Sequence, residues 1–292
     1  MSYTTDLPEY TAPGGVVPGK PSLSALLSCW RAFALTSDEH FGRVYEGYLE
    51  LQTAANSRLF DQVRAHPNGR KLMRYKPELR ARLHDDEYLA SLPVGSVGHA
   101  FRAFLNINRF DVGVFDEASV IRPIAERRNW DEDFYYFMVR YLTLHDMFHV
   151  IGGYSPDVAG EVTMVGFHCG QVEPAGLLEK FGYLMALGVP GAPVQHRIRV
   201  YRQAIERGRR ADKLVAAPWE ELLERPLDEV RELLGVAPTR VAHPDGLWFT
   251  TWTATGAKAW SGSDGKVASK WDYEAILARE TAQGSAQPST RD

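Results

Sequence analysis

Apolar residues recur at intervals of three and four over most of the chain, which is the spacing that places them on one face of an α-helix. In the segment 92–110 an opening turn leads into a helix whose apolar face is formed by Val97, Phe101, Phe104 and Leu105. The same spacing predicts helices over residues 21–36, 38–66, 192–213 and 218–236, the last divided into two short helices at Pro226 and capped by Gly235.

A central helix is expected to begin at about Asp131, where a run of acidic residues suits the positive end of a helix dipole. It ends near the glycine pair 152–153. A turn rich in Gly, Ser and Pro follows, and the next helix is expected to open at Gly160. Residues 67–70 break the periodic pattern, and residues 114–129 are interpreted as a connecting region.

The pattern as a whole predicts a mainly α protein. Only residues 246–254 have the composition of a β-strand, and the chain shows neither an internal repeat nor an interdomain linker. We therefore predict a single-domain helical bundle over residues 21–236, which also holds a metal site. A flexible arm rich in Pro, Gly and Thr (1–20) precedes it, and a C-terminal extension (237–292) with a disordered end follows it.

Composition narrows the class of protein without naming a function. The 292 residues are 45% hydrophobic and 24% charged with a net charge of −4, which is ordinary for a globular protein and argues against a nucleic-acid partner. No apolar run approaches the ~18–20 residues that a membrane-spanning helix needs. The two cysteines, Cys29 and Cys169, cannot build a disulfide framework, and the first residues lack the pattern of a secretory or transit leader. These features favour a cytoplasmic location.

The stretch LTLHDMFHVIGGYSPDVAGEVTM, residues 142–164, contains a candidate metal site. His145 and His149 are four residues apart and share a helical face, Asp146 flanks the same edge, and Glu161 faces back from beyond the turn. Two imidazoles with carboxylates suit zinc, and also iron(II) or manganese. The alternative is that the histidines are ordinary polar residues of a buried helix. A zincin site is disfavoured because Asp rather than Glu follows the first His.

These four residues carry a resemblance to a known family. His145, Asp146, His149 and Glu161 match, position for position, the His-Asp-x-x-His-x11-Glu motif of the COQ-four family of coenzyme Q (ubiquinone) biosynthesis proteins. The similarity extends over roughly residues 37–236, and it includes the segments 68–79, 89–110 and 218–236.

The resemblance implies a mainly helical fold, a zinc-type site built from the four motif residues, and a place in quinone biosynthesis. The implied reaction is metal-dependent removal of the ring carboxyl from a prenylated hydroxybenzoate, with or without replacement by hydroxyl. The implied partners are this hydrophobic phenolic substrate, other quinone-biosynthesis enzymes and the membrane surface. Two alternatives are a non-catalytic lipid-binding scaffold that organises those enzymes, and a tailoring enzyme of secondary metabolism on the same fold.

The chain departs from the family pattern after the motif glutamate. The family's Lys-Trp-Phe-Glu stretch is replaced by Val-Gly-Phe-His at residues 165–168. His168 lies seven residues after Glu161 on the same helical face, and it is a candidate catalytic residue as a ligand or general base. The alternative is a polar core group that replaces the missing acid. Cys169 is next to it, and Tyr154, His168 and Glu161 are candidate proton carriers.

The predicted helix 192–213 is strongly basic. Its arginines suggest peripheral attachment to the inner face of the cytoplasmic membrane, because each basic residue near an anionic surface contributes about 1 kcal/mol. Tryptophans of the C-terminal extension would add interfacial contacts. The alternative is a solvated helix face with the tryptophans in a core, and a homodimer is also left open. The residues concerned are Arg197, Arg199, Arg202, Arg207, Arg209 and Arg210, with Trp248, Trp252, Trp260 and Trp271.

Overall fold

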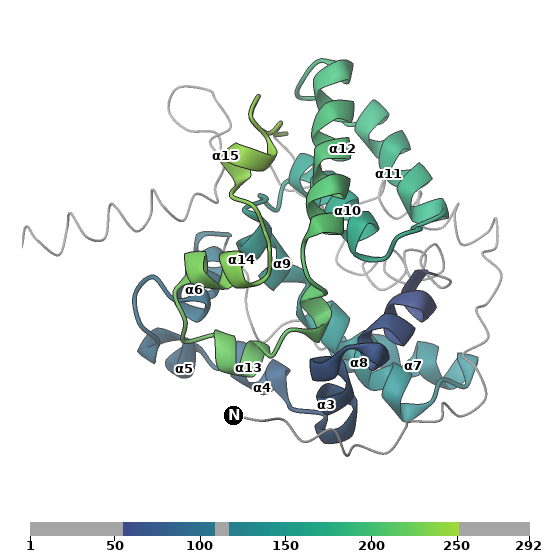
Figure 1. Ribbon diagram of the computed structural model, residues 1–292, viewed down its shortest axis with the longest axis vertical. Helices are drawn as coiled ribbons and strands as arrows, with labels where there is room; N and C mark the ends of the chain where they lie inside the picture. Colours follow the sequence, from purple (N-terminus) through teal and green to yellow (C-terminus); the bar gives the residue numbers. More distant parts are fainter. Residues whose placement is uncertain (1–54, 109–116, 251–292) are drawn as a thin grey trace, which may run out of the picture.

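The computed structural model describes residues 55–108 and 117–250 (Figure 1). Within these ranges the chain is helical and contains no β-strand, which confirms the mainly α prediction. Residues 55–65 form a helix. The elements that follow are α3 (Pro67–Tyr75), α4 (Leu79–Leu83), α5 (Asp86–Ser91), α6 (Val97–Asn108), α7 (Glu117–Arg128), α8 (Glu132–Thr143), α9 (His145–Gly152), α10 (Val158–Gln171), α11 (Leu177–Gly188), α12 (Val194–Arg210), the 3-10 turn η2 (Leu214–Ala216), α13 (Trp219–Leu222), α14 (Leu227–Leu233) and α15 (Thr239–Ala242).

The helices form two groups with α9 between them. Figure 1 shows α10, α11 and α12 together at one end of the molecule, and α3, α4, α5, α7, α8 and α13 at the other. Helix α9 contacts α6 and α8 on one side and α10 on the other. The helix that carries both motif histidines therefore lies in the interior, where its environment is set by both groups.

Helices α10 and α12 cross at very short range because glycines line their contact. A Cβ atom added at Gly208 of α12 would lie 2.0 Å from the backbone oxygen of Phe167. A Cβ atom added at Gly170 of α10 would lie 2.1 Å from the backbone oxygen of Ile205. No other residue type fits at either position, so these glycines set the distance between the two helices.

Helix ends follow the sequence signals at several places. Asp131 caps α8 by accepting a hydrogen bond from the backbone N–H of Phe134 at 2.7 Å. Gly153 ends α9 in the left-handed region with φ of +67°, and Gly235 follows α14 with φ of +64°. The predicted helix 192–213 and the two short helices divided at Pro226 are confirmed as α12, α13 and α14.

Several predicted elements were wrong. The central helix is two helices, α8 and α9, which meet at the fully buried Leu144. No glycine or proline marks this break, because tertiary packing rather than local sequence imposes it. The supposed break at residues 67–70 is the first turn of α3, where Pro67 occupies a position whose N–H has no helical partner.

The connecting region expected at residues 114–129 is largely the helix α7. Pro123 interrupts the sequence pattern, yet Ile121, Ile124 and Ala125 are buried against the core and hold the segment helical. Helix α11 was not predicted. No strand forms over residues 246–250, and the rest of that predicted strand lies outside the described residues.

A buried ion pair ties α8 to the segment around α13. Arg140 is buried and binds the Glu220 carboxylate through both terminal nitrogens, at 2.6 and 3.1 Å. Its guanidinium also donates to the backbone oxygens of Ala217 and Val215. The buried positive charge of Arg140 is therefore neutralised by the Glu220 carboxylate, and its N–H groups are hydrogen-bonded.

The helices of the described residues include none with the length and apolar character to cross a membrane. The predicted helix 21–36, the N-terminal arm and Trp252, Trp260 and Trp271 lie outside the described residues, as does most of the C-terminal extension. The part of the extension that is described, residues 237–250, packs on the loop after α9 and buries Trp248 and Thr250. The division into arm, domain and extension stays a prediction.

Candidate metal centre

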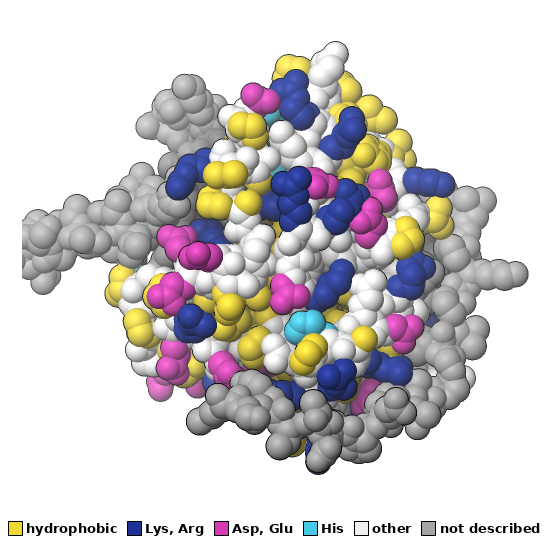
Figure 2. Space-filling model, in the orientation of Figure 1, with side chains coloured by type: hydrophobic (Ala, Val, Ile, Leu, Met, Phe, Trp, Pro, Cys, Tyr) yellow, Lys and Arg dark blue, Asp and Glu magenta, His cyan; other side chains and the backbone are white. Residues whose placement is uncertain are grey.

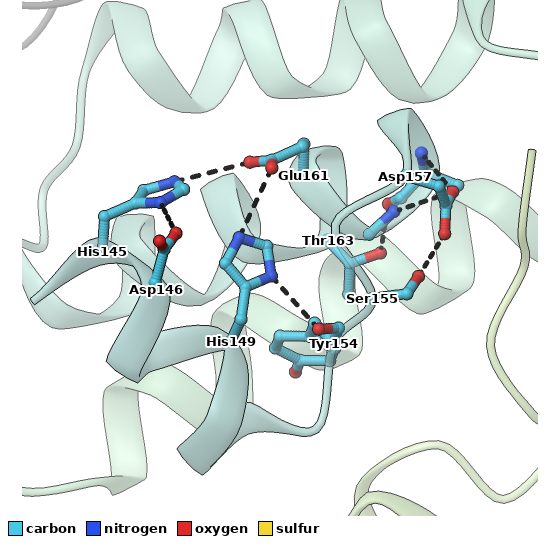
Figure 3. A network of polar contacts seen from close by, with 10 residues as sticks. His145, Asp146, His149, Tyr154, Ser155, Asp157, Glu161 and Thr163 are labelled. Carbon is cyan, nitrogen blue, oxygen red and sulfur yellow. Dashed lines mark hydrogen bonds and ion pairs between the residues drawn. The ribbon is translucent and has the colours of Figure 1, made fainter. Parts of the chain in front are cut away.

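Three side chains of the sequence motif converge at the facing parts of α9 and α10. Figure 3 shows His145 and His149 pointing from α9 toward Glu161 in the first turn of α10. The Nε2 atom of His145 lies 3.4 Å from Glu161 Oε2, and the Nε2 atom of His149 lies 3.5 Å from Glu161 Oε1. One ligand atom from each residue lies within 4.8 Å of the other two, which is close enough for one ion to bind all three.

The fourth motif residue, Asp146, does not join this cluster. Its carboxylate lies on the opposite nitrogen of His145, with Oδ1 3.1 Å from Nδ1 (Figure 3). Successive residues of a helix point roughly 100° apart, so Asp146 cannot follow His145 toward Glu161. The structure therefore gives Asp146 a different position from the predicted ligand: it orients the imidazole and raises its basicity, as carboxylates behind metal-bound histidines do.

His149 is held in the tautomer that a metal ligand requires. Its Nδ1 atom lies 3.1 Å from the backbone oxygen of Tyr154, which can only accept, so Nδ1 carries the proton. Its Nε2 atom is buried, faces Glu161 and has no hydrogen-bond partner among the described residues. The ring of Phe104 stacks on the imidazole with centroids 5.7 Å apart and fixes its plane. A buried Nε2 atom that has no hydrogen-bond partner and lies beside a carboxylate is an arrangement that a divalent cation fits.

The charges of the cluster are strongly coupled. Burial alone would lower the pKa of His145, but its hydrogen bonds with Asp146 and Glu161 outweigh this effect and raise the pKa to about 10. Burial alone would raise the pKa of Glu161, yet the His149 and His145 imidazoles hold it well below its usual range. Without a metal ion, the cluster is therefore a carboxylate neutralised by a protonated His145.

Metal uptake at neutral pH is expected to release a proton. Below a pKa of about 10 His145 is protonated, so a cation must displace that proton, and affinity should rise about tenfold per pH unit up to that pKa. Calorimetry at pH 8 in buffers of different ionisation enthalpy should give about one proton released per ion. Asp146→Asn removes one cause of the raised pKa and should reduce the release. Uptake without proton release in the wild type would contradict the assignment of His145.

His168 lies beside the cluster without belonging to it. It is on α10, as predicted, and its ring centroid is 6.4 Å from that of His145 and 5.1 Å from that of Phe148. The side chain is buried, and neither ring nitrogen has a hydrogen-bond partner among the described residues. Burial, followed by the nearby His145 and His149, lowers the pKa of His168 to about 3, so its imidazole is neutral. The ring has one donor and one acceptor left for a bound molecule.

Two other residues singled out from the sequence face away from the cluster. Cys169 is buried with its Sγ atom 3.6 Å from the hydroxyl of Tyr201 on α12, and burial raises its pKa to about 12. The hydroxyl of Tyr154 lies 3.1 Å from Nε2 of His243, and only the backbone oxygen of Tyr154 supports the site. Neither side chain is placed to carry a proton to the cluster.

Sequence reasoning missed the side chains that hold the end of α9. Arg231 donates to the backbone oxygens of Val150 and Ile151, both at 3.1 Å. Arg207 donates to the backbone oxygen of Gly152 at 2.5 Å. These carbonyls have no partner within the helix, so the two arginines complete their hydrogen bonding and anchor the ligand-bearing helix.

The structure also changes the interpretation of the basic helix. Arg197 and Arg207 are buried and donate to backbone oxygens, so they cannot face a membrane. Three others form ion pairs at the surface: Arg199 with Asp245, Arg209 with Glu173 and Glu206, and Arg210 with Glu206. Fewer arginines of α12 are therefore free to contact an anionic membrane surface than the sequence indicates.

Comparison with known proteins identifies the family. The sequence profile described as "Coenzyme Q (ubiquinone) biosynthesis protein Coq4" matches residues 38–240, a range that contains the whole metal cluster. The chain belongs to the Coq4 family. This confirms the resemblance seen in the sequence.

Individual Coq4 relatives are similar to about two thirds of the chain. The mitochondrial ubiquinone biosynthesis protein COQ4 of Paracoccidioides lutzii is 32% identical over 183 residues, covering 61% of this chain and 60% of the fungal protein. The mitochondrial COQ4 homolog of Rattus norvegicus is 30% identical over 197 residues, covering 65% of this chain and 68% of the rat protein. The match therefore spans about 60% of the length of the fungal relative.

A solved structure shows the same fold. The crystal structure of a Nostoc punctiforme protein named for ubiquinone biosynthesis superposes with a TM-score of 0.53 at 22% sequence identity. The superposition covers 73% of this chain and 97% of that protein. The Coq4 helical arrangement is thus shared at low sequence identity.

Proposed function

We propose that this chain is a metal-dependent enzyme of coenzyme Q biosynthesis that acts on the ring carboxyl of a prenylated hydroxybenzoate. The observation that carries the proposal is the cluster of His145, His149 and Glu161, with the buried Nε2 of His149 unpaired. Three protein ligands leave a coordination position for a substrate oxygen, as catalytic metal sites do. Membership of the Coq4 family and the names of its relatives support this pathway.

The ligand set favours zinc, with iron(II) and manganese as alternatives. Two imidazoles and one carboxylate suit all three metals, and with iron they make the arrangement of non-haem oxygenases. A bound divalent ion would supply charge stabilisation for a phenolate or carboxylate of the substrate. Zinc has no redox chemistry, so a hydroxylating reaction would need iron, or electrons from the substrate itself.

The residues of the chain have separate roles in this proposal. Asp146 keeps His145 oriented, and the backbone oxygen of Tyr154 keeps His149 oriented. In a non-oxidative decarboxylation the bond between ring and carboxyl breaks, carbon dioxide leaves and the ring carbon takes up a proton. His168 is the group proposed to relay that proton, because its neutral ring offers an unpaired donor and an unpaired acceptor next to the cluster.

Glu161→Gln is expected to disable the reaction without unfolding the chain. The amide is nearly isosteric with the acid, but it binds metal less well and cannot take up a proton. Product formation should fall at least a hundredfold in protein that is still folded at the assay temperature, although the thermal midpoint of the metal-free protein should fall because the carboxylate that pairs with His145 is lost. Mass spectrometry of cells that carry only the variant should show a precursor that retains its ring carboxyl.

A lipid-binding scaffold is the second candidate, and one surface feature favours it. Leu177, Leu184 and Leu187 of α11 and Val194 of α12 are exposed, and hydrophobic side chains gather along that edge of the molecule (Figure 2). A membrane surface, a prenyl chain or a pathway enzyme would bind there, with the metal ion as a structural clip. If Glu161→Gln lowers the thermal midpoint strongly and leaves quinone production intact, the scaffold is the correct function.

A further inference from the structure

The segment 239–250, which we call the C-terminal strap, lies across the loop that joins α9 to α10. Near its start the hydroxyl of Thr239 donates to the backbone oxygen of Gly152 at 3.3 Å. In its middle, Nε2 of His243 lies 3.1 Å from the hydroxyl of Tyr154. At its end Thr250 donates to Oδ1 of Asp157 twice, from the backbone N–H at 3.0 Å and from the hydroxyl at 3.1 Å. The strap therefore contacts the last residue of α9 and two residues of the loop that follows it.

The contacts of the strap with Tyr154 and Asp157 involve residues that position the proposed metal ligands. The backbone oxygen of Tyr154 accepts from Nδ1 of His149 and sets the direction of that imidazole. The carboxylate of Asp157 caps α10 by accepting from the N–H groups of Ala159 and Gly160, at 2.9 and 3.4 Å (Figure 3). Glu161 lies in the turn that this cap fixes. Movement of the loop would move both ligands.

The middle contact has a defined direction. The Nδ1 atom of His243 lies 3.2 Å from the side-chain oxygen of Gln203 on α12, which accepts, so Nδ1 carries the proton. The Nε2 atom of His243 therefore accepts from the hydroxyl of Tyr154. Tyr154, Asp157, His243 and Thr250 are all buried, so water does not compete for these hydrogen bonds.

We infer that the strap is a positioning element of the metal centre, in which His243 and Thr250 fix Tyr154 and Asp157 and thereby the directions of His149 and Glu161. The inference rests on the proposed metal site. The Coq4 profile ends at residue 240, so His243 and Thr250 lie outside the matched range and extend the support of the site beyond it.

The test measures zinc affinity by competition with a chromogenic chelator, in the full-length chain. His243→Phe and Thr250→Val are each expected to weaken zinc binding by about tenfold, the lower end of the effect of groups that orient metal ligands. His243→Gln keeps an acceptor for the Tyr154 hydroxyl and should recover most of the affinity. The double variant Tyr154→Phe, His243→Phe should bind zinc no more weakly than either single variant, because each substitution removes the same hydrogen bond.

Leu89→Val in α5 is the stability control. Leu89 is fully buried and lies on a helix away from the strap, so the change should lower the thermal midpoint and leave zinc affinity unchanged. The inference would be overturned if the wild type binds zinc and both His243→Phe and Thr250→Val bind it with an affinity within twofold of the wild-type value. An equal loss of affinity in Leu89→Val would also overturn it, since stability alone would then explain the loss. If the wild type and His149→Ala both lack zinc, the metal site itself fails, which is a separate result.

Discussion

His149→Ala is expected to abolish metal binding at micromolar concentrations, whereas the wild-type chain takes up one divalent ion. The Nε2 atom of His149 is the most enclosed donor of the cluster, and alanine leaves only His145 and Glu161. Elemental analysis of protein exposed to zinc and then desalted measures the content directly. His145→Ala should behave in the same way, and His84→Ala, outside the cluster, should keep the full content.

The loss should also appear in the thermal midpoint. A ligand at a hundred times its dissociation constant stabilises a protein by about 2.7 kcal/mol, which corresponds to roughly 5–10 °C for a chain of this size. A strong chelator should therefore lower the midpoint of the zinc-loaded wild type by that amount and leave His149→Ala unchanged. Equal metal content in the wild type and both histidine variants would remove the basis of the proposed function.

Gly208→Ala is expected to destabilise the fold strongly, although it replaces only one hydrogen atom by a methyl group. The added carbon would lie 2.0 Å from the backbone oxygen of Phe167, so α10 and α12 must separate. Overpacking of this kind costs about 3 kcal/mol, and the thermal midpoint should fall by roughly 6–12 °C.

The matched control is Gly188→Ala at the end of α11. A Cβ atom added there meets nothing within 4 Å, so its midpoint should stay within about 2 °C of the wild type. Thermal unfolding followed by circular dichroism compares the two variants under the same conditions. If both variants unfold at the wild-type temperature, the close crossing of α10 and α12 does not exist in solution.

The sequence predicted the site better than it predicted the helix boundaries. His145, His149 and Glu161 could be placed together because helical spacing and a glycine-containing turn determine their relation locally. Asp146 lies instead against Nδ1 of His145, because a residue next to another on a helix points to a different side, and its role as a ligand stays a prediction.

The elements that were wrong are those that distant contacts impose. Residues 114–129 were interpreted as a connecting region, whereas most of them form α7, with Ile121 and Ile124 buried against the core. The break at Leu144 has no local signal at all. The roles of Arg207 and Arg231 could not be predicted, because their acceptors on α9 lie 55 and about 80 residues earlier in the chain.

The residues of the proposed metal site are close together in sequence, whereas the strap that contacts the neighbouring loop comes much later in the chain. Thr250 and Asp157 are 93 residues apart, and ribosomes add roughly 5–20 residues per second, so about 5–20 s separate the synthesis of the ligands from that of their clamp. During that interval the three residues of the proposed metal site are already part of the chain, while the residues of the strap are not. The order of synthesis thus separates the formation of the proposed site from the formation of its support.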